Sequence, residues 1–385
     1  MFSLEYSDIQ EQIKDTAAKF AQEEIAPSVI ERDIKSEFPR EILNKMGELG
    51  FLGMIVAPEW GGSGLDPISY VLAIEEISKV DASVSIVMSV QNSLVNWIIE
   101  NYGNDFQKEK YLRPLAEGKY LGAYCLSEPE AGSDARHLTT LAEKGDDGLW
   151  HLNGMKNWIS TAHNADIYIV FVQTNPQLLH KGITAFIVEK GTPGFELGKK
   201  EDKMGMRSSD TSSISLTDVK IPEENLINKV GNGFYIAMRG LNGGRIGIAA
   251  QALGIAQGAF EASVKYSQER KTMGKPIAEH QLIQQKLAQM SMKISAARML
   301  VHKAAYLRMI GADHIQASSE AKLFASTIAV DVAREAIQIH GGYGYVREYN
   351  VERMLRDAKV TEIYEGTSEI QHIVIAREII KKSTL

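Results

Sequence analysis

The chain has 385 residues and a formal net charge of −7, with 44% apolar and 24% charged residues. This length predicts two or three domains, and the composition is that of a soluble globular protein. Neither the net charge nor any dense Lys/Arg run indicates a nucleic-acid partner. The single cysteine, Cys125, excludes internal disulfides and fits a reducing compartment.

The N-terminal segment has no recognisable targeting signal. It begins Met-Phe-Ser-Leu-Glu-Tyr-Ser-Asp, which is acidic and lacks a basic region followed by an apolar stretch. No apolar run approaches the ~18 residues that a membrane span needs. We therefore expect a cytoplasmic protein without membrane insertion, or a mitochondrial-matrix protein if the chain is a processed eukaryotic form.

Residues 1–118 are expected to form an all-helical domain. A helix is expected from Pro39, a favourable first-turn residue, to Gly50, which ends it. Two longer apolar segments, 67–80 and 83–102, predict two further helices.

Residues 119–229 change to the pattern of a small β domain, either a barrel or a sandwich. Short β-branched or alternating runs predict strands at 167–172, 183–188 and 213–219. The Asn153–Gly154 pair after Trp150 predicts a hairpin turn.

Residues 230–385 return to a helical pattern that is almost free of proline. Helices are expected at 246–266, 281–309, 317–340 and 368–382. Because their connections are short, the four helices predict an antiparallel four-helix bundle. The fold class is therefore mainly α with a central β domain.

Several common catalytic signatures are absent from the sequence. There is no G-x-G-x-x-G after a strand, no phosphate-binding P-loop and no G-x-S-x-G. His-Glu-x-x-His and paired Cys-x-x-Cys motifs are also missing, so no metal site is expected.

Three segments place polar side chains where packing alone would not need them. Residues 124–134 (Tyr-Cys-Leu-Ser-Glu-Pro-Glu-Ala-Gly-Ser-Asp) offer hydroxyls and backbone N–H groups to a heteroaromatic ring or a phosphate. Residues 157–161 (Asn-Trp-Ile-Ser-Thr) place an indole where it could lie against a flat cofactor. A polar loop and a core tryptophan are the ordinary explanations of these two segments.

The third segment, 364–369 (Tyr-Glu-Gly-Thr-Ser-Glu), precedes the final helix, which Thr367 or Ser368 can cap. Glu365 then lies just outside the helix, beside Gly366, which lets a ligand approach the backbone closely. A carboxylate in a partly apolar setting has a raised pKa, which suits proton abstraction near neutral pH. The alternative is a solvated acid near a helix start.

In this order and at these distances, the three segments resemble the acyl-CoA dehydrogenase family over essentially the whole chain. The Glu-Pro-x-Ala-Gly-Ser-Asp stretch from Glu128 and the Tyr-Glu-Gly-Thr-Ser-Glu-Ile-Gln stretch from Tyr364 carry the resemblance. It implies the helical–β–helical plan described above, FAD as the cofactor and Glu365 as the catalytic base.

The resemblance also implies which residues bind FAD. The loop at the flavin ring would comprise Tyr124, Leu126, Ser127, Gly132 and Ser133. The reactive side of the flavin would be flanked by Trp158, Ile159 and Ser160. The phosphates and adenosine of an FAD held largely by a neighbouring subunit would contact Arg270, Gln281, Gln338, Gly341 and Gly342, and the last FAD contacts would be Thr367 and Glu369.

The acyl-CoA substrate would be contacted by Ser133, Asn242, Arg245, Gly366 and Arg377. Many relatives have Asp where this chain has Asn242. The resemblance further implies that the Glu365 N–H and a ribityl hydroxyl of FAD bind the thioester carbonyl. Glu365 would take the α-proton while the β-hydrogen leaves as hydride to the flavin. An electron-transfer flavoprotein would accept the electrons, and the protein would be a homotetramer.

The substrate class follows from the same resemblance. Isovaleryl- and long-chain-type members carry their base where this chain has Gly244–Arg245, and the segment 244–254 is most similar to short-chain, butyryl-type members. Ser85 stands where glutaryl-type members have an arginine, so decarboxylation is not expected. The expected function is FAD-dependent α,β-dehydrogenation of a short-chain acyl-CoA to the trans-2-enoyl-CoA. The alternatives are a 2-methyl-branched or medium-chain acyl-CoA dehydrogenase, and a non-catalytic FAD-binding assembly or protective protein.

Overall fold

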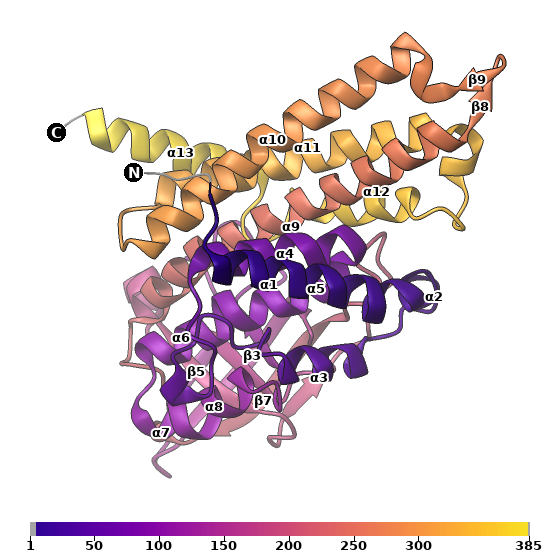
Figure 1. The fold of residues 1–385 in the computed structure, drawn as a ribbon. Coiled ribbons are helices and arrows are strands. Elements are labelled where there is room, and N and C mark those ends of the chain that lie inside the picture. The colour runs from indigo at the N-terminus through magenta and orange to yellow at the C-terminus, as the bar shows by residue number, and fades with distance from the viewer. Residues whose placement is uncertain (1–4, 384–385) are drawn as a thin grey trace.

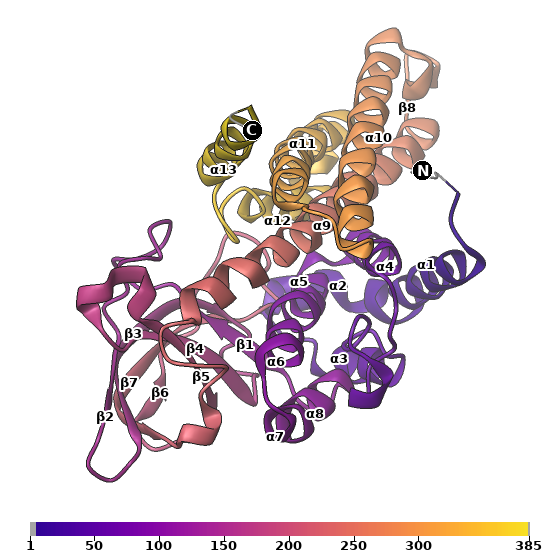
Figure 2. The same cartoon turned by 90° about the vertical axis from the view of Figure 1, so that its left-hand side faces the viewer.

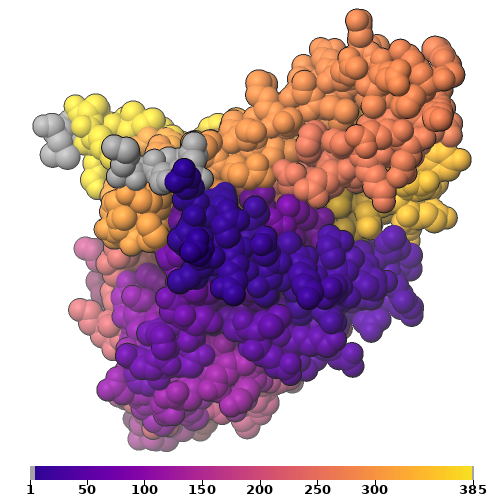
Figure 3. Space-filling model, viewed as in Figure 1, coloured from indigo at the N-terminus to yellow at the C-terminus, as the bar shows by residue number. Residues whose placement is uncertain are grey.

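The computed structural model describes residues 5–383, so the outermost residues of the expected first and last domains lie outside the described part. The N-terminal helices lie below the long orange and yellow helices of the C-terminal part (Figure 1). Turned by 90°, the β-sheet and the N-terminal helices lie side by side beneath the C-terminal helices (Figure 2). The space-filling view shows the long helices projecting beyond the rest of the molecule (Figure 3).

The N-terminal part is helical, as expected. Its helices are α1 (Asp8–Phe20), α2 (Val29–Lys35), α3 (Arg40–Glu48), α4 (Pro67–Val80), α5 (Ala82–Val90), α6 (Trp97–Tyr102), α7 (Asp105–Gln107) and α8 (Arg113–Ala116). The start of α4 is set by Asp66, whose carboxylate accepts hydrogen bonds from the N–H groups of Ile68 and Ser69, and by Pro67 in the first turn.

The expectation that no segment is apolar and long enough to span a membrane was wrong for Ala82–Tyr102. This helical segment of 21 residues has a mean hydropathy of 1.3, and 94% of its apolar window is buried inside the protein. It is the one such helix among residues 5–383. Its place at the centre of the N-terminal helices is that of a core helix, where an apolar surface is covered by neighbouring helices.

The middle part is a seven-stranded sheet in the order β1-β4-β2-β3-β7-β6, with β5 paired to β4. The strands are β1 (Gly122–Cys125), β2 (Leu141–Lys144), β3 (Trp150–Ser160), β4 (Ile167–Gln173), β5 (Ile183–Glu189), β6 (Phe195–Leu197) and β7 (Thr211–Ile221). The three strand predictions are therefore confirmed in β4, β5 and β7.

The hairpin turn predicted at Asn153–Gly154 was wrong. These two residues lie inside β3, where the pairing with β7 shifts register between Leu152 and Gly154. Gly154 has φ +144°, and a Cβ there would lie 2.7 Å from Thr140 Cα. The glycine thus serves a β-bulge and a close backbone approach.

The C-terminal part consists of α9 (Gly233–Glu269), the β8–β9 hairpin (Lys271–Thr272 and Lys275–Pro276), α10 (Gln281–Met309), α11 (Ile315–His340), α12 (Val351–Val360) and α13 (Ser368–Ser383). The long α9 lies directly on α4. A Cβ at Gly254 or Gly258 would come within 2.4 Å of a backbone carbonyl oxygen of α4. These glycines are what allow the two helices to approach so closely.

A hydrogen bond and an ion pair join α12 to the other two parts of the protein. Asp357 pairs with Arg353 at 2.7 Å and accepts a hydrogen bond from the Met206 N–H at 2.6 Å. Arg356 pairs with Asp33 at 2.6 Å. Because α12 leads into the turn that carries Glu365, all three parts of the chain contribute to where that turn lies.

Candidate active site

The turn between α12 and α13 has an unusual backbone conformation. Glu365 has φ +52° and Gly366 has φ +94°. The left-handed region suits glycine but strains a glutamate, which therefore needs surrounding structure to hold it there. The following helix is capped by Thr367, whose hydroxyl accepts a hydrogen bond from the Ile370 N–H at 3.3 Å. The turn thus presents one strained glutamate at a fixed position.

The Glu365 side chain points into the protein. Although the residue as a whole is half-buried, both carboxylate oxygens are buried and have no hydrogen-bond partner. The carboxylate lies against α9 at Gly244, where an added Cβ would be 2.0 Å from Oε2. Only a glycine at position 244 leaves space for this carboxylate in its present position.

The surroundings of Glu365 control its charge. Burial raises its pKa to about 7, while the positive charges of Lys322 and Arg245 oppose that rise. The same carboxylate raises the pKa of Tyr124, after the larger effect of burial. A carboxyl group that titrates near pH 7 can take a proton from a substrate and later release it, as a general base requires.

Replacing Glu365 by Gln is expected to change how stability depends on pH. The folded-state pKa of about 7 lies above the usual value of 4.5, so the folded protein binds this proton more tightly than the unfolded chain. Its stabilising contribution is complete below pH 4.5 and is lost as the pH rises through 7. The loss amounts to at most about 3 kcal/mol per protomer. Between pH 5 and pH 8, the melting temperature of the Glu365→Gln holoenzyme should rise by a few degrees relative to wild type. If the difference in melting temperature between the two proteins stays the same from pH 5 to pH 8, the raised pKa of Glu365 is contradicted.

Arg245 lies on α9, next to Gly244, and is only 6% exposed. Its Nη1 donates to Asn242 Oδ1 at 2.9 Å and reaches Ser319 Oγ at 3.5 Å, whereas its buried Nε has no partner. Its pKa is lowered to about 10, chiefly by burial and also by the positive charge of Arg377, while the Glu365 carboxylate opposes this shift, so the guanidinium is still charged at neutral pH. Because Asn242 is neutral, its hydrogen bond does not balance this positive charge, and Arg245 forms no ion pair among residues 5–383. A buried guanidinium in this state suits an anionic or strongly polar ligand.

Of the other residues expected at the substrate, Gly366 and Arg377 lie near this centre. Gly366 directly follows Glu365, and its carbonyl faces α11 through a hydrogen bond from Lys322. Arg377 is exposed on α13, and Ser133 is exposed in the loop after β1. Arg377 is close enough to Arg245 to affect its pKa. No hydrogen bond or ion pair among residues 5–383 joins Ser133 to Glu365.

The two segments expected at the flavin lie against each other. The Asn157 N–H donates to the Ser127 carbonyl at 2.8 Å. The buried Lys156 ammonium donates to the Leu126 carbonyl at 3.2 Å and to Glu128 at 2.7 Å. Both side chains of the Lys156–Glu128 pair are completely buried. This pair fixes the loop after β1 to strand β3.

Beside this junction the protein presents an aromatic surface. Strand β3 changes register between Lys156 and Ile159, and Trp158 has φ +61°, which leaves its side chain 62% exposed. Ile159 is buried and Ser160 half-buried. Gly132 is exposed with open space around it. A free indole next to hydroxyls and an open loop fits a flat heteroaromatic ring such as that of FAD.

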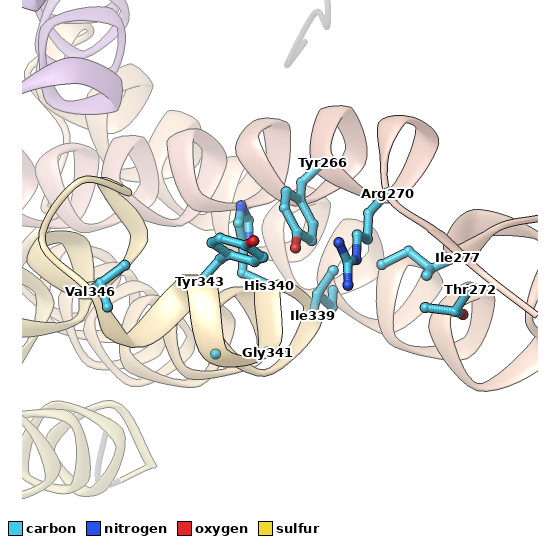
Figure 4. Close-up of a pocket in the computed structure, with 10 residues that line it drawn as sticks. Tyr266, Arg270, Thr272, Ile277, Ile339, His340, Gly341, Tyr343 and Val346 are labelled. Atoms are coloured by element: carbon cyan, nitrogen blue, oxygen red, sulfur yellow. The ribbon is translucent and has the colours of Figure 1, made fainter.

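A second site lies at the far end of α9. It is a cavity of about 510 Å³ lined by Tyr266, Arg270, Thr272, Ile277, Ile339, His340, Gly341, Gly342, Tyr343 and Val346 (Figure 4). Tyr266 stacks on His340 with ring centroids 4.2 Å apart, and Arg270 lies over the Tyr343 ring at 5.7 Å. An arginine beside aromatic rings and glycines suits a nucleotide with its phosphates.

The expected FAD residues therefore divide between two places. Arg270, Gly341 and Gly342 line the distal cavity, whereas Gln281, the first residue of α10, and Gln338, near the end of α11, are exposed. Thr367 and Glu369 begin α13, close to Glu365. Along α9, the rise of 1.5 Å per residue puts Arg270 about 39 Å from Gly244. A single chain does not bring the two groups together.

Two residues at the centre, Gln251 and Lys322, were not singled out from the sequence. Lys322 is completely buried within a helix of small residues. A lysine among small residues is the sequence pattern that could have pointed to it. Gln251 is completely buried in a helix that is apolar nearly all round. What these residues contact depends on packing between distant segments.

Protein-family models match nearly the whole chain. The acyl-CoA dehydrogenase N-terminal domain matches residues 7–119, the middle domain residues 123–219 and the C-terminal domain residues 231–380. A short-chain specific acyl-CoA dehydrogenase of Megasphaera elsdenii is 48% identical over 97% of this chain and 99% of its own length.

Solved structures agree with these matches. The butyryl-CoA dehydrogenase of Megasphaera elsdenii superposes with a TM-score of 0.97 and 47% identity, covering 98% of this chain and 100% of its own. A chain from work on the electron transferring flavoprotein of Acidaminococcus fermentans also has a TM-score of 0.97 at 47% identity, covering 98% of this chain and 99% of its own. The protein therefore belongs to the acyl-CoA dehydrogenase family and is a flavin-dependent oxidoreductase with FAD as its cofactor.

Proposed function

We propose that this protein dehydrogenates a short-chain acyl-CoA between its α and β carbons and yields the trans-2-enoyl-CoA. The observation that carries the proposal is the buried Glu365 carboxylate, which has no partner and has a pKa of about 7. Glu365 breaks the α C–H bond by taking the proton. FAD, when bound, supplies the acceptor for the hydride that leaves the β carbon.

The α-proton of a thioester is far less acidic than a carboxylic acid, so the carbonyl oxygen needs hydrogen-bond donors as negative charge develops on it. Among the described residues, no hydrogen bond engages the Glu365 N–H. We assign this N–H to the thioester carbonyl. A donor of this kind is typically worth on the order of 10²–10³ in rate.

The CoA part of the substrate carries negative charge, which is the proposed partner of the Arg245 guanidinium. In the proposed complex, Asn242 orients the Arg245 guanidinium for this contact. Exposed Ser133 and Arg377 extend this polar surface outwards. In the proposed complex, Gly366 leaves room for the thioester end of the substrate to pass beside the base.

Hydrogen-bonded polar side chains around Gln251 support the preference for a short acyl chain. On the face of α9 that carries Gly244, the next turns carry Gly247 and Gln251. Gln251 Nε2 donates to Ser85 Oγ at 3.0 Å and to the Ala82 carbonyl at 2.9 Å, and its Oε1 accepts from the Tyr364 hydroxyl. In the proposed complex, these hydrogen-bonded side chains limit the depth available to the acyl chain beyond Glu365.

Electron transfer and assembly complete the proposal. An electron-transfer flavoprotein is the proposed electron acceptor, which is supported by the similarity to a chain studied with such a flavoprotein. The distance between the two groups of FAD residues supports a homo-oligomer, with a tetramer as the proposed form. In it, the distal cavity of one chain, with Arg270 and Gly341, would serve the flavin beside Glu365 of another.

The test is an anaerobic titration of the FAD-loaded protein with butyryl-, 2-methylbutyryl-, octanoyl- and palmitoyl-CoA, followed by turnover with an electron-transfer flavoprotein. Butyryl-CoA is expected to bleach the flavin absorption at the lowest concentration. Bleaching only by a longer or branched substrate would overturn the short-chain assignment, and a flavin that no acyl-CoA reduces would overturn the activity.

Replacing Gln251 by Ala is expected to enlarge the space for the acyl chain beyond Glu365. The ratio of kcat/KM for octanoyl-CoA to that for butyryl-CoA should rise roughly tenfold or more, since each added methylene in an apolar pocket contributes 10- to 200-fold. Gln257→Ala is the matched control, because Gln257 lies on the same helix and bonds to Glu261 and Arg298 away from Glu365. An unchanged ratio in Gln251→Ala would show that another group limits the chain length.

A further inference from the structure

Lys322 is a buried cation that forms no ion pair within the part of the chain that the structure describes. It lies on α11 and is completely buried. Among residues 5–383 it makes no ion pair, and its Nζ donates one hydrogen bond, to the Gly366 carbonyl at 2.7 Å. Gly366 directly follows Glu365. A buried ammonium is thus attached to the backbone of the turn that carries the base.

Packing alone does not explain a lysine at this position. A buried ammonium costs free energy unless its charge is compensated, and Met or Leu would fill similar space without that cost. The hydrogen bond is not unique either, because Gln371 Nε2 also donates to the Gly366 carbonyl, at 2.9 Å. What Lys322 adds, and Gln371 does not, is a positive charge beside Glu365.

We propose that Lys322 is a positioning residue for the base: it anchors the Glu365–Gly366 turn, and its charge favours the ionised carboxylate. The inference rests on the proposed function, in which ionised Glu365 takes the α-proton. The backbone of the base's own turn sets the position of this cation. Its effect therefore does not depend on a bound substrate.

The other groups around Glu365 do not replace this charge. Arg245 faces it from α9, and Tyr70, Tyr124 and Tyr364 face it from α4, β1 and its own turn. All three tyrosines have raised pKa values, chiefly because they are buried, so they are neutral near pH 7. Arg245 is the second cation, but it is the group assigned to the substrate.

The charge state of Lys322 is consistent with this role. Burial lowers its pKa to about 8, with Glu365, Glu362 and Glu369 raising it and Arg245 lowering it. The ammonium form therefore predominates at pH 7. In turn, Lys322 is the largest influence that lowers the pKa of Glu365.

The experiment compares pH profiles of kcat/KM for butyryl-CoA in the FAD-loaded protein. In Lys322→Met, the acidic limb is expected to move to higher pH by about one to two units, the usual effect of losing a neighbouring opposite charge. Lys322→Arg, which keeps the charge, should retain the limb of the wild type. Gln371→Leu removes the hydrogen bonds from Gln371 to the Glu365 and Gly366 carbonyls but keeps the charge of Lys322, so it should lower the rate without moving the limb.

A readout without turnover accompanies the profiles. The free energy of unfolding is measured as a function of pH with and without the Glu365→Gln change, first in the wild type and then in Lys322→Met. The effect of Glu365→Gln on this free energy should become constant at a higher pH in Lys322→Met than in the wild type, because the pKa of Glu365 is higher there. Lys322→Gln, which can still donate to Gly366, replaces Lys322→Met if the latter does not fold. If neither neutral variant folds and Lys322→Arg does, the role of Lys322 is structural and the inference is overturned.

The outcomes separate this inference from the proposed function. An acidic limb that stays in place in Lys322→Met, together with an inactive Glu365→Gln, overturns only the role of Lys322. A Glu365→Gln variant as active as the wild type overturns the assignment of the base, whatever the Lys322 variants do.

Discussion

Glu365→Gln is expected to retain FAD and to lose at least ~10²-fold in kcat with butyryl-CoA, because a positioned general base typically contributes 10²–10⁴-fold. The amide is nearly the same size as the carboxylate, so it can occupy the same space against Gly244. It cannot accept the α-proton. Single-turnover reduction of the flavin, followed by its absorbance, measures the effect directly.

A control variant and a pH profile test whether the loss of rate is specific to the Glu365 carboxylate. Glu143→Gln changes an exposed carboxylate on strand β2 and should leave both the rate and the spectrum unchanged. Wild-type kcat/KM should fall as the pH drops below about 7, since the carboxylate with that pKa must be ionised to act. Undiminished flavin reduction by Glu365→Gln would remove Glu365 from the role of base.

Arg245→Met is expected to lower kcat/KM at least ~10²-fold, while the protein remains as stable as the wild type or becomes more stable. Removing one partner of a buried charged contact typically costs 2–5 kcal/mol in binding. In the ligand-free protein, however, the guanidinium is buried with an unsatisfied Nε and no ion pair among the described residues. A methionine of similar length removes that cost.

Activity and stability should therefore change in opposite directions, which a general packing defect would not produce. Arg245→Lys is also expected to be impaired, because a lysine lacks the planar donor geometry of the guanidinium. Arg113→Met serves as the control, since Arg113 forms a surface pair with Glu109 on the far side of the N-terminal helices. A large loss of melting temperature in Arg245→Met would contradict this account and indicate a structural role.

Local signals in the sequence predicted most elements of the fold. The bounds of α4 coincide with the expected 67–80, because a capping aspartate and a proline mark its start and apolar residues continue to its end. The expected turn at Asn153–Gly154 failed because the same dipeptide also suits a bulge inside a strand. Only the pairing of β3 with β7 decides between the two.

The sequence by itself determined the helical–β–helical order and the family, and it led to the proposal of Glu365 as the base, because each of these depends on motifs of neighbouring residues. The tertiary structure alone decided the chemistry around that base. The raised pKa of Glu365 comes from burial, and the opposing charges come from Lys322 and Arg245, both distant along the chain. Desolvation and electrostatic interaction depend on distances in space. No local pattern in a sequence carries those distances.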